Sequence, residues 1–134
     1  MFMLRVDLAL ALIRIMLGLV CTLHGSQKVL GAFGGPGLQG FVNWIGSLGV
    51  PAVLGYLAAF FEFAGGLLLL FGIASRLGAA MVIPVMLGAI YLVHLKNGFF
   101  TQNGGYEYPL VLLVMALALV IGGSGSLTLM KFME

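Results

Sequence analysis

Charged residues are scarce in this chain of 134 residues: only 7% are charged, and the formal net charge is +2. The charges are too few and too scattered for a nucleic-acid surface, so no nucleic-acid partner is expected. Cys21 is the single cysteine, which excludes an internal disulfide and a paired-thiol redox motif. The two histidines and few carboxylates show no metal-ligand spacing, so no metal site is predicted.

Hydrophobic residues, in contrast, are in large excess. They make up 62% of the chain, and the mean hydropathy is +1.19. A soluble domain cannot cover so much apolar surface, so the composition predicts an integral membrane protein. The apolar runs are continuous rather than alternating, which favours helices over a β-barrel. We expect one all-α transmembrane domain over residues 1–134.

Four apolar segments predict a bundle of four transmembrane helices. Arg5 precedes the first segment as in a signal peptide, but Arg14 interrupts it and no convincing cleavage site follows. We therefore expect this segment to be retained as a span. The fourth span is short, about 24 Å at 1.5 Å per residue, which places its first residues at the membrane mouth. The spans are expected at about 8–31, 50–71, 77–95 and 106–121.

The distribution of basic residues predicts the topology. An even number of spans places both termini on the same side. Arg5, Arg76 and Lys131 fall on that side, against Lys28 and Lys96 on the other. This bias is weak, but it favours cytoplasmic termini.

The connection between the first two spans contains a short amphipathic helix at about 38–48. Leu38, Phe41, Val42, Ile45 and Leu48 recur at helical spacing, and Trp44 suits the headgroup boundary. This segment either lies along the outer surface without a role in a site or dips into the membrane as a lid. Both interpretations stay open.

Glu62 is an isolated carboxyl near the middle of the second span. An ionisable group inside a span costs roughly 2.5–3.5 kcal/mol on insertion, so it is either protonated or paired with a cation. Arg14, His24 and Lys28 of the first span are candidate partners. Glu62 is interpreted either as part of a ligand pocket or as a structural ion pair that fixes helix register.

Polar residues gather at the outer ends of the spans. His24, Gln27 and Lys28 end the first span and His94 ends the third, while Tyr106, Glu107 and Tyr108 begin the fourth. We expect these ends to surround one opening. A quinone headgroup suits its aromatic groups and hydrogen-bond donors. A small anion suits Lys28 and Lys96. A haem between His24 and His94 is disfavoured. Each lysine taken alone is better explained by a side chain that reaches for lipid headgroups.

Several motifs resemble the DoxX family of small bacterial membrane proteins. They are the stretch LGLVCTLHGSQKVLGAFGGPGLQGF, then FFEFAGGLLLLFGIASRL, VHLKNGFF and GGYEYPLVLL. The resemblance implies a four-helix fold in the bacterial inner membrane. It also implies a link to redox chemistry, since the related DoxD protein is a subunit of an archaeal thiosulfate:quinone oxidoreductase. The residues that match the family pattern are His24, Lys28, Glu62, Asn97, Gly98, Glu107 and Tyr108.

Together these features predict a membrane redox component that binds a quinone or a similar hydrophobic ligand in an outer-leaflet pocket. Electrons would come from an oxidoreductase partner subunit, and a homo-oligomer is compatible with this prediction. A non-enzymatic scaffold or assembly factor is the alternative, and a small-solute transporter ranks third. The predicted catalytic residues are Glu62 and His24, and the predicted ligand-binding residues are Arg14, Gln27, Lys28, His94, Asn97, Tyr106, Glu107 and Tyr108.

Overall fold

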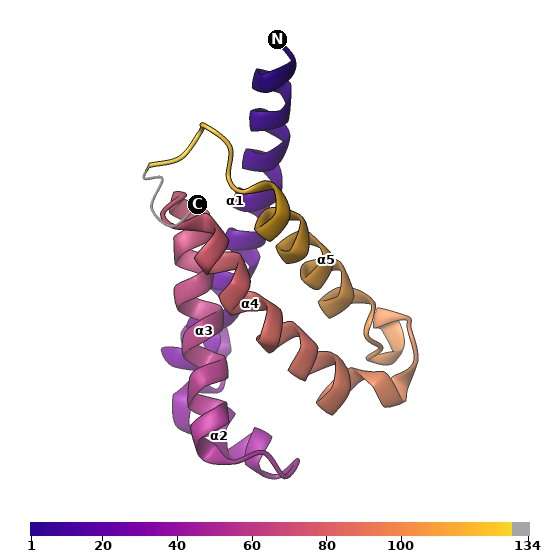
Figure 1. Ribbon diagram of the computed structural model, residues 1–134. Coiled ribbons are helices and arrows are strands. Elements are labelled where there is room, and N and C mark those ends of the chain that lie inside the picture. Colours follow the sequence, from indigo (N-terminus) through magenta and orange to yellow (C-terminus); the bar gives the residue numbers. More distant parts are fainter. Residues whose placement is uncertain (130–134) are drawn as a thin grey trace.

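The computed structural model describes residues 1–129, and helices dominate this part of the chain (Figure 1). The α-helices are α1 (Phe2–Val29), α2 (Gly37–Gly46), α3 (Ala52–Phe71), α4 (Ser75–Ala89) and α5 (Glu107–Gly122). A π-helical turn (Ile90–His94) and a 3-10 turn (Leu95–Asn97) continue α4, so the helical segment runs from Ser75 to Asn97. The protein is an all-α integral membrane protein with a short amphipathic helix in its first connection.

Within residues 1–129, three helical segments are long and apolar enough to cross a membrane: Phe2–Val29, Ala52–Phe71 and Ser75–Asn97. Helix α5 is apolar but has only 16 residues, so the fourth span stays a prediction. Helix α1 begins six residues before the predicted span at residue 8, because nothing in its first turns breaks a helix. Lys131 lies outside the described residues, and the orientation of the termini also stays a prediction.

The ends of the helices follow from local sequence. Helix α3 begins directly after Pro51 and ends at Gly72, which adopts the left-handed conformation with φ of 67°. Pro109 occupies the first turn of α5, where its missing N–H removes no helical hydrogen bond. These breaks fix the lengths of the helices independently of their packing.

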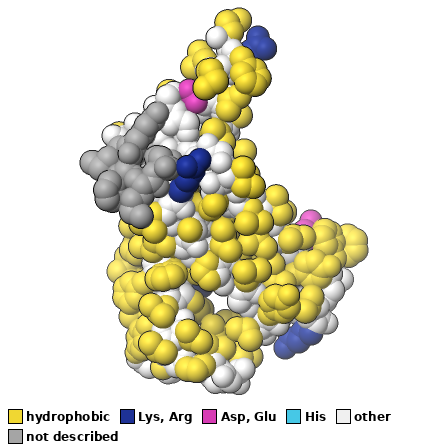
Figure 2. Space-filling view, viewed as in Figure 1, with side chains coloured by type: hydrophobic (Ala, Val, Ile, Leu, Met, Phe, Trp, Pro, Cys, Tyr) yellow, Lys and Arg dark blue, Asp and Glu magenta, His cyan; other side chains and the backbone are white. Residues whose placement is uncertain are grey.

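The four long helices form a closed ring of contacts. Helix α1 packs along α3, α3 against α4, α4 against α5, and α5 returns to α1, while α2 packs on α3 and the end of α1. In Figure 1, α4 and α5 form a hairpin that tilts away from α3 toward its connecting loop. Hydrophobic side chains cover much of the face shown in Figure 2, as expected for contact with lipid.

Glycines set the close approach of α1 and α3. A Cβ atom on Gly25 would lie 2.5 Å from the Cα of Phe63, and one on Gly66 would lie 2.5 Å from the backbone nitrogen of Thr22. Small residues of this kind let membrane helices pack backbone against backbone. A polar side chain on α1 can therefore contact a polar side chain on α3 directly.

Candidate functional site

A cleft of about 650 Å³ opens between α2, α3 and α4. It appears as the hollow in the lower half of Figure 2. This volume lies within the range of about 300–1,000 Å³ that small-molecule sites occupy. Its walls are mostly apolar. The α1 end contributes Gln27 and Lys28, α2 contributes Phe41, Trp44 and Ile45, α3 contributes Leu54, Leu57, Ala58 and Phe61, and α4 with its continuation contributes Pro84, Val85, Gly88, Ala89, Leu92, Val93 and His94.

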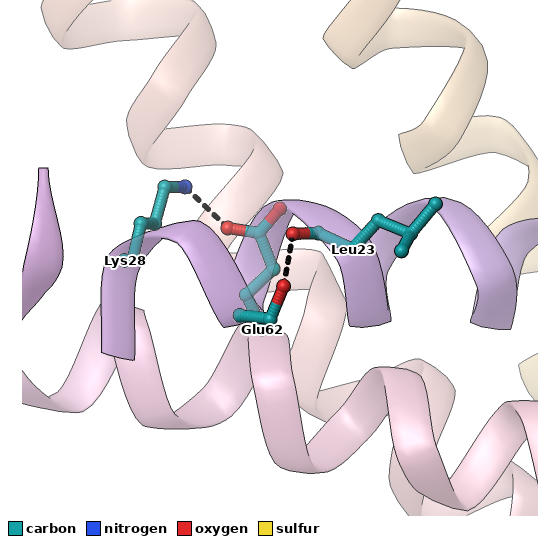
Figure 3. A network of polar contacts seen from close by, with 4 residues as sticks. Leu23, Lys28 and Glu62 are labelled. Carbon is teal, nitrogen blue, oxygen red and sulfur yellow. Dashed lines mark hydrogen bonds and ion pairs between the residues drawn. The ribbon is translucent and has the colours of Figure 1, made fainter. Parts of the chain in front are cut away.

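Lys28 and Glu62 form an ion pair at the inner side of this cleft. Figure 3 shows the two side chains pointing toward each other from α1 and α3. The Glu62 side chain is 4% exposed and that of Lys28 is 25% exposed. The ammonium of Lys28 also lies 5.0 Å from the centre of the Phe41 ring, a cation–π contact. Glu62 is not among the lining residues, so it lies behind Lys28.

The glycine contacts explain why this pair forms. Gly25 lies one turn before Lys28 on α1, and Gly66 lies one turn after Glu62 on α3. Both glycines allow direct backbone contact between α1 and α3. The Lys28 side chain is therefore close enough to α3 to reach the Glu62 carboxylate. Lys28 therefore does not extend toward lipid headgroups, as the sequence alone suggested for a single lysine. It is instead the counter-ion of Glu62.

His94 lines the cleft at the end of the π-helical turn. Its Nδ1 lies 2.7 Å from the carbonyl oxygen of Gly104. A carbonyl only accepts hydrogen bonds, so Nδ1 is the donor, and in a neutral ring Nε2 is then the acceptor. π-Helical turns are rare in proteins, but many of those that occur lie at functional sites. This one places the imidazole at the cleft.

The loop that follows is folded by its own polar residues. Asn97 Nδ2 donates to the Gly104 carbonyl at 3.1 Å, and the backbone N–H of Thr101 donates to the Glu107 carboxylate at 3.1 Å. The Tyr106 ring packs edge-on against Phe99 at a centroid distance of 5.6 Å. Asn97, Tyr106 and Glu107 are thus engaged within the loop, and none of them lines the cleft.

His24 and Tyr108 lie outside the cleft. Their rings, from α1 and α5, contact each other at a centroid distance of 5.7 Å, and both side chains are exposed. His24 and His94 therefore do not line one cavity, which separates the two imidazoles that a haem would need. Gln27 does line the cleft, and its amide Nε2 donates a long hydrogen bond of 3.4 Å to the Phe33 carbonyl.

Arg14 is buried near the middle of α1, 14 residues before Lys28, or about 21 Å at 1.5 Å per residue. Its guanidinium donates to the carbonyl oxygens of Leu69 at 3.2 Å and Leu127 at 3.0 Å. The predicted site residues thus divide into a cleft group, a loop group, the His24–Tyr108 pair and Arg14. The structure brings Gln27, Lys28 and His94 together at the cleft and places Glu62 behind Lys28.

Sequence reasoning missed the apolar walls of the cleft. Leu54, Leu57 and Phe61 on α3 look like lipid-facing residues in the sequence, and so does Leu92 beyond α4. The one available signal was Pro84 in the middle of an apolar span, because proline removes a helical hydrogen bond and bends the helix.

Comparison with known proteins gives a family and two relatives. A family model described as DoxX matches residues 9–95. The chain is 31% identical over 126 residues to a protein of Bacillus subtilis (strain 168) named "Putative oxidoreductase CatD", covering 94% of this chain and 87% of that protein. It is 27% identical over 88 residues to an uncharacterized protein of Haemophilus influenzae, covering 66% of this chain and 51% of that protein. No solved structure matches the chain.

Proposed function

The chain belongs to the DoxX family, and from this premise we propose that it is the membrane component of a redox system and binds a quinone or a similar lipid-soluble ligand in the cleft between α2, α3 and α4. The Bacillus subtilis relative carries the name oxidoreductase, which supports the redox assignment. Without a dithiol or a sequence motif for a bound electron carrier, the chain depends on a partner subunit for electrons.

The observation that carries this proposal is the combination of apolar walls with a small polar end. The isoprenoid tail of a quinone needs an apolar channel, and its ring oxygens need a few hydrogen-bonding groups. The α3 and α4 walls supply the first, and Gln27, Lys28 and His94 supply the second. A site of this composition recognises one polar headgroup on a hydrophobic body.

Each polar residue has a distinct role in this proposal. The ammonium of Lys28 donates to a ring oxygen, and Glu62 is a positioning residue that holds the ammonium in place. Helix α2 covers the headgroup with Phe41 and Trp44, so it acts as the lid of the cleft. His24 and Tyr108 are not part of this site.

Filling the cleft is the test. Gly88 lines the cleft, and a Cβ atom there would meet nothing within 4 Å. Gly88→Leu therefore adds an apolar side chain to the cavity without a clash and with a better helix former. We expect it to weaken binding of a short-chain ubiquinone or menaquinone at least tenfold, measured by equilibrium titration of the protein in lipid nanodiscs.

Gly46→Leu is the matched control. A Cβ atom on Gly46 also meets nothing within 4 Å, and Gly46 lies outside the cleft. This variant should bind the quinone as the wild type does. A wild-type protein that binds neither quinone, or a Gly88→Leu variant that binds as tightly as the wild type, contradicts the proposal and favours a non-enzymatic scaffold.

A further inference from the structure

The position of His94 leads beyond the binding of a quinone in general. We propose that the cleft selects the reduced, hydroxyl-bearing form of its ligand, a hydroquinone, over the oxidised quinone. This inference rests on the proposed function, because it concerns the same cleft. Its evidence is separate, namely the hydrogen-bonding state of one imidazole.

The loop fixes which nitrogen of His94 faces a ligand as an acceptor. Nδ1 lies 2.7 Å from the Gly104 carbonyl, so its proton is used there and the neutral ring offers the lone pair of Nε2. The Gly104 carbonyl is itself held in place, since Asn97 donates to it and the Gly104 N–H donates to the Thr101 carbonyl at 2.8 Å. The loop therefore selects the tautomer of the neutral ring in which Nε2 is the acceptor.

The two walls of the cleft present opposite hydrogen-bonding characters. Lys28 on α1 is a donor. Its ammonium forms the ion pair with Glu62 and also lies over the Phe41 ring. His94 is the only polar residue among those that α4 and its continuation contribute to the cleft. The cleft thus offers a donor on the α1 side and an acceptor on the α4 side.

These characters fit a hydroquinone better than a quinone. One hydroquinone oxygen accepts from Lys28, and the hydroxyl on the opposite side of the ring donates to Nε2 of His94. A quinone has a carbonyl in place of that hydroxyl, and a carbonyl oxygen gains nothing from an imidazole lone pair. Only a protonated His94 would donate a hydrogen bond to that carbonyl oxygen. The loss of one such hydrogen bond corresponds to about tenfold in affinity.

Preferential binding of the reduced form has a redox consequence. It raises the midpoint potential of the bound ligand above that of the free ligand. For a two-electron couple, tenfold tighter binding of the hydroquinone corresponds to about 30 mV.

The experiment compares both redox forms of one ligand on the wild-type protein in nanodiscs under anaerobic conditions. We expect short-chain ubiquinol to bind about tenfold more tightly than short-chain ubiquinone. The dimethyl ether of the ubiquinol, which has no hydroxyl to donate, should bind no more tightly than the quinone.

His94→Phe keeps a ring of similar size but removes Nε2, together with the Nδ1 contact to the Gly104 carbonyl. It should weaken ubiquinol binding about tenfold and change ubiquinone binding by less than twofold. His24→Phe is the matched control, because His24 lies outside the cleft, and it should leave both affinities unchanged. The comparison of ligands on the wild-type protein does not depend on how either variant folds.

The failures of the two proposals are distinguishable. If neither redox form binds, the proposed function is wrong and this inference falls with it. If both bind but the quinone binds as tightly as the hydroquinone, or more tightly, the preference for the reduced form is wrong and the proposed function stands.

Discussion

Helix α1 carries Arg14 near its middle and Lys28 in its last turn, and the surroundings of these two cations differ. Arg14 is enclosed by backbone, with its guanidinium on the carbonyls of Leu69 and Leu127. A Cβ atom on Gly72 would lie 2.0 Å from its Nη1, and the end of α3 with residues 126–129 lines a pocket of about 540 Å³ beside it. Lys28 is paired with Glu62 on one side and faces a cleft of about 650 Å³ on the other. Both cations thus border a pocket, but only the pocket at Lys28 lies between α2, α3 and α4.

This difference shows that a charge inside a membrane span is not by itself evidence of a site. The insertion cost is of similar size for Arg14 and Lys28, and both are compensated. What distinguishes them is the lining of the adjoining pocket, which comes from α2, α3 and α4 at Lys28 and from the end of α3 and the segment after α5 at Arg14. The comparison therefore predicts that both cations contribute to stability and that only Lys28 contributes to ligand binding.

The largest expected effect comes from breaking the Lys28–Glu62 pair. Lys28→Met leaves a carboxylate buried without its cation, which should lower the free energy of unfolding by about 3–5 kcal/mol. The double variant Lys28→Met/Glu62→Leu removes both charges and should recover most of that loss. Denaturant unfolding in mixed detergent micelles measures both, and a double variant as unstable as Lys28→Met would contradict the pairing.

A smaller effect on stability is expected at Arg14. Arg14→Met leaves the carbonyls of Leu69 and Leu127 without these two bonds, which should cost about 2 kcal/mol while quinone binding stays as in the wild type. Arg76→Met is the matched control, because Arg76 donates a single exposed hydrogen bond to the Ile121 carbonyl at 3.2 Å. It should cost less than Arg14→Met. Weakened quinone binding in a folded Arg14→Met variant would contradict the claim that only Lys28 contributes to ligand binding.

Much of the fold was predictable because composition constrains it strongly. The apolar excess predicts an all-α membrane protein, and the periodicity at residues 38–48 predicts the amphipathic helix that the structure places at Gly37–Gly46. The motifs around Lys28 and Glu62 predict the DoxX family, which the family model confirms over residues 9–95. These features depend on local sequence.

The partner of Glu62 was only partly predictable. The need for a cation follows from the insertion cost of a lone carboxylate, and Arg14, His24 and Lys28 all satisfied it. The choice among them depends on the depth at which α1 and α3 cross. That depth is set by the contacts at Gly25 and Gly66, which appear only when the helices are packed together.

Two features of the site could not be predicted: the walls of the cleft and the partners of the loop residues. The walls depend on the tilt of α4 relative to α3, and a tilt is not encoded in any single motif. The roles of Asn97 and Glu107 depend on backbone partners in their own loop, Gly104 and Thr101. In the sequence these side chains look like free ligand-binding groups, because hydrogen bonds to backbone leave no pattern of residue types.

The central claim is that the cleft between α2, α3 and α4 holds the ligand. The most direct measurement is photolabelling of the protein in nanodiscs with an azidoquinone, followed by mass spectrometry of the labelled peptides. We expect labels on cleft residues such as Trp44, Leu54 and Leu92, removed by excess unlabelled quinone and lost in Gly88→Leu. Labels concentrated at His24 and Tyr108, or spread over lipid-facing positions without competition, would contradict the account.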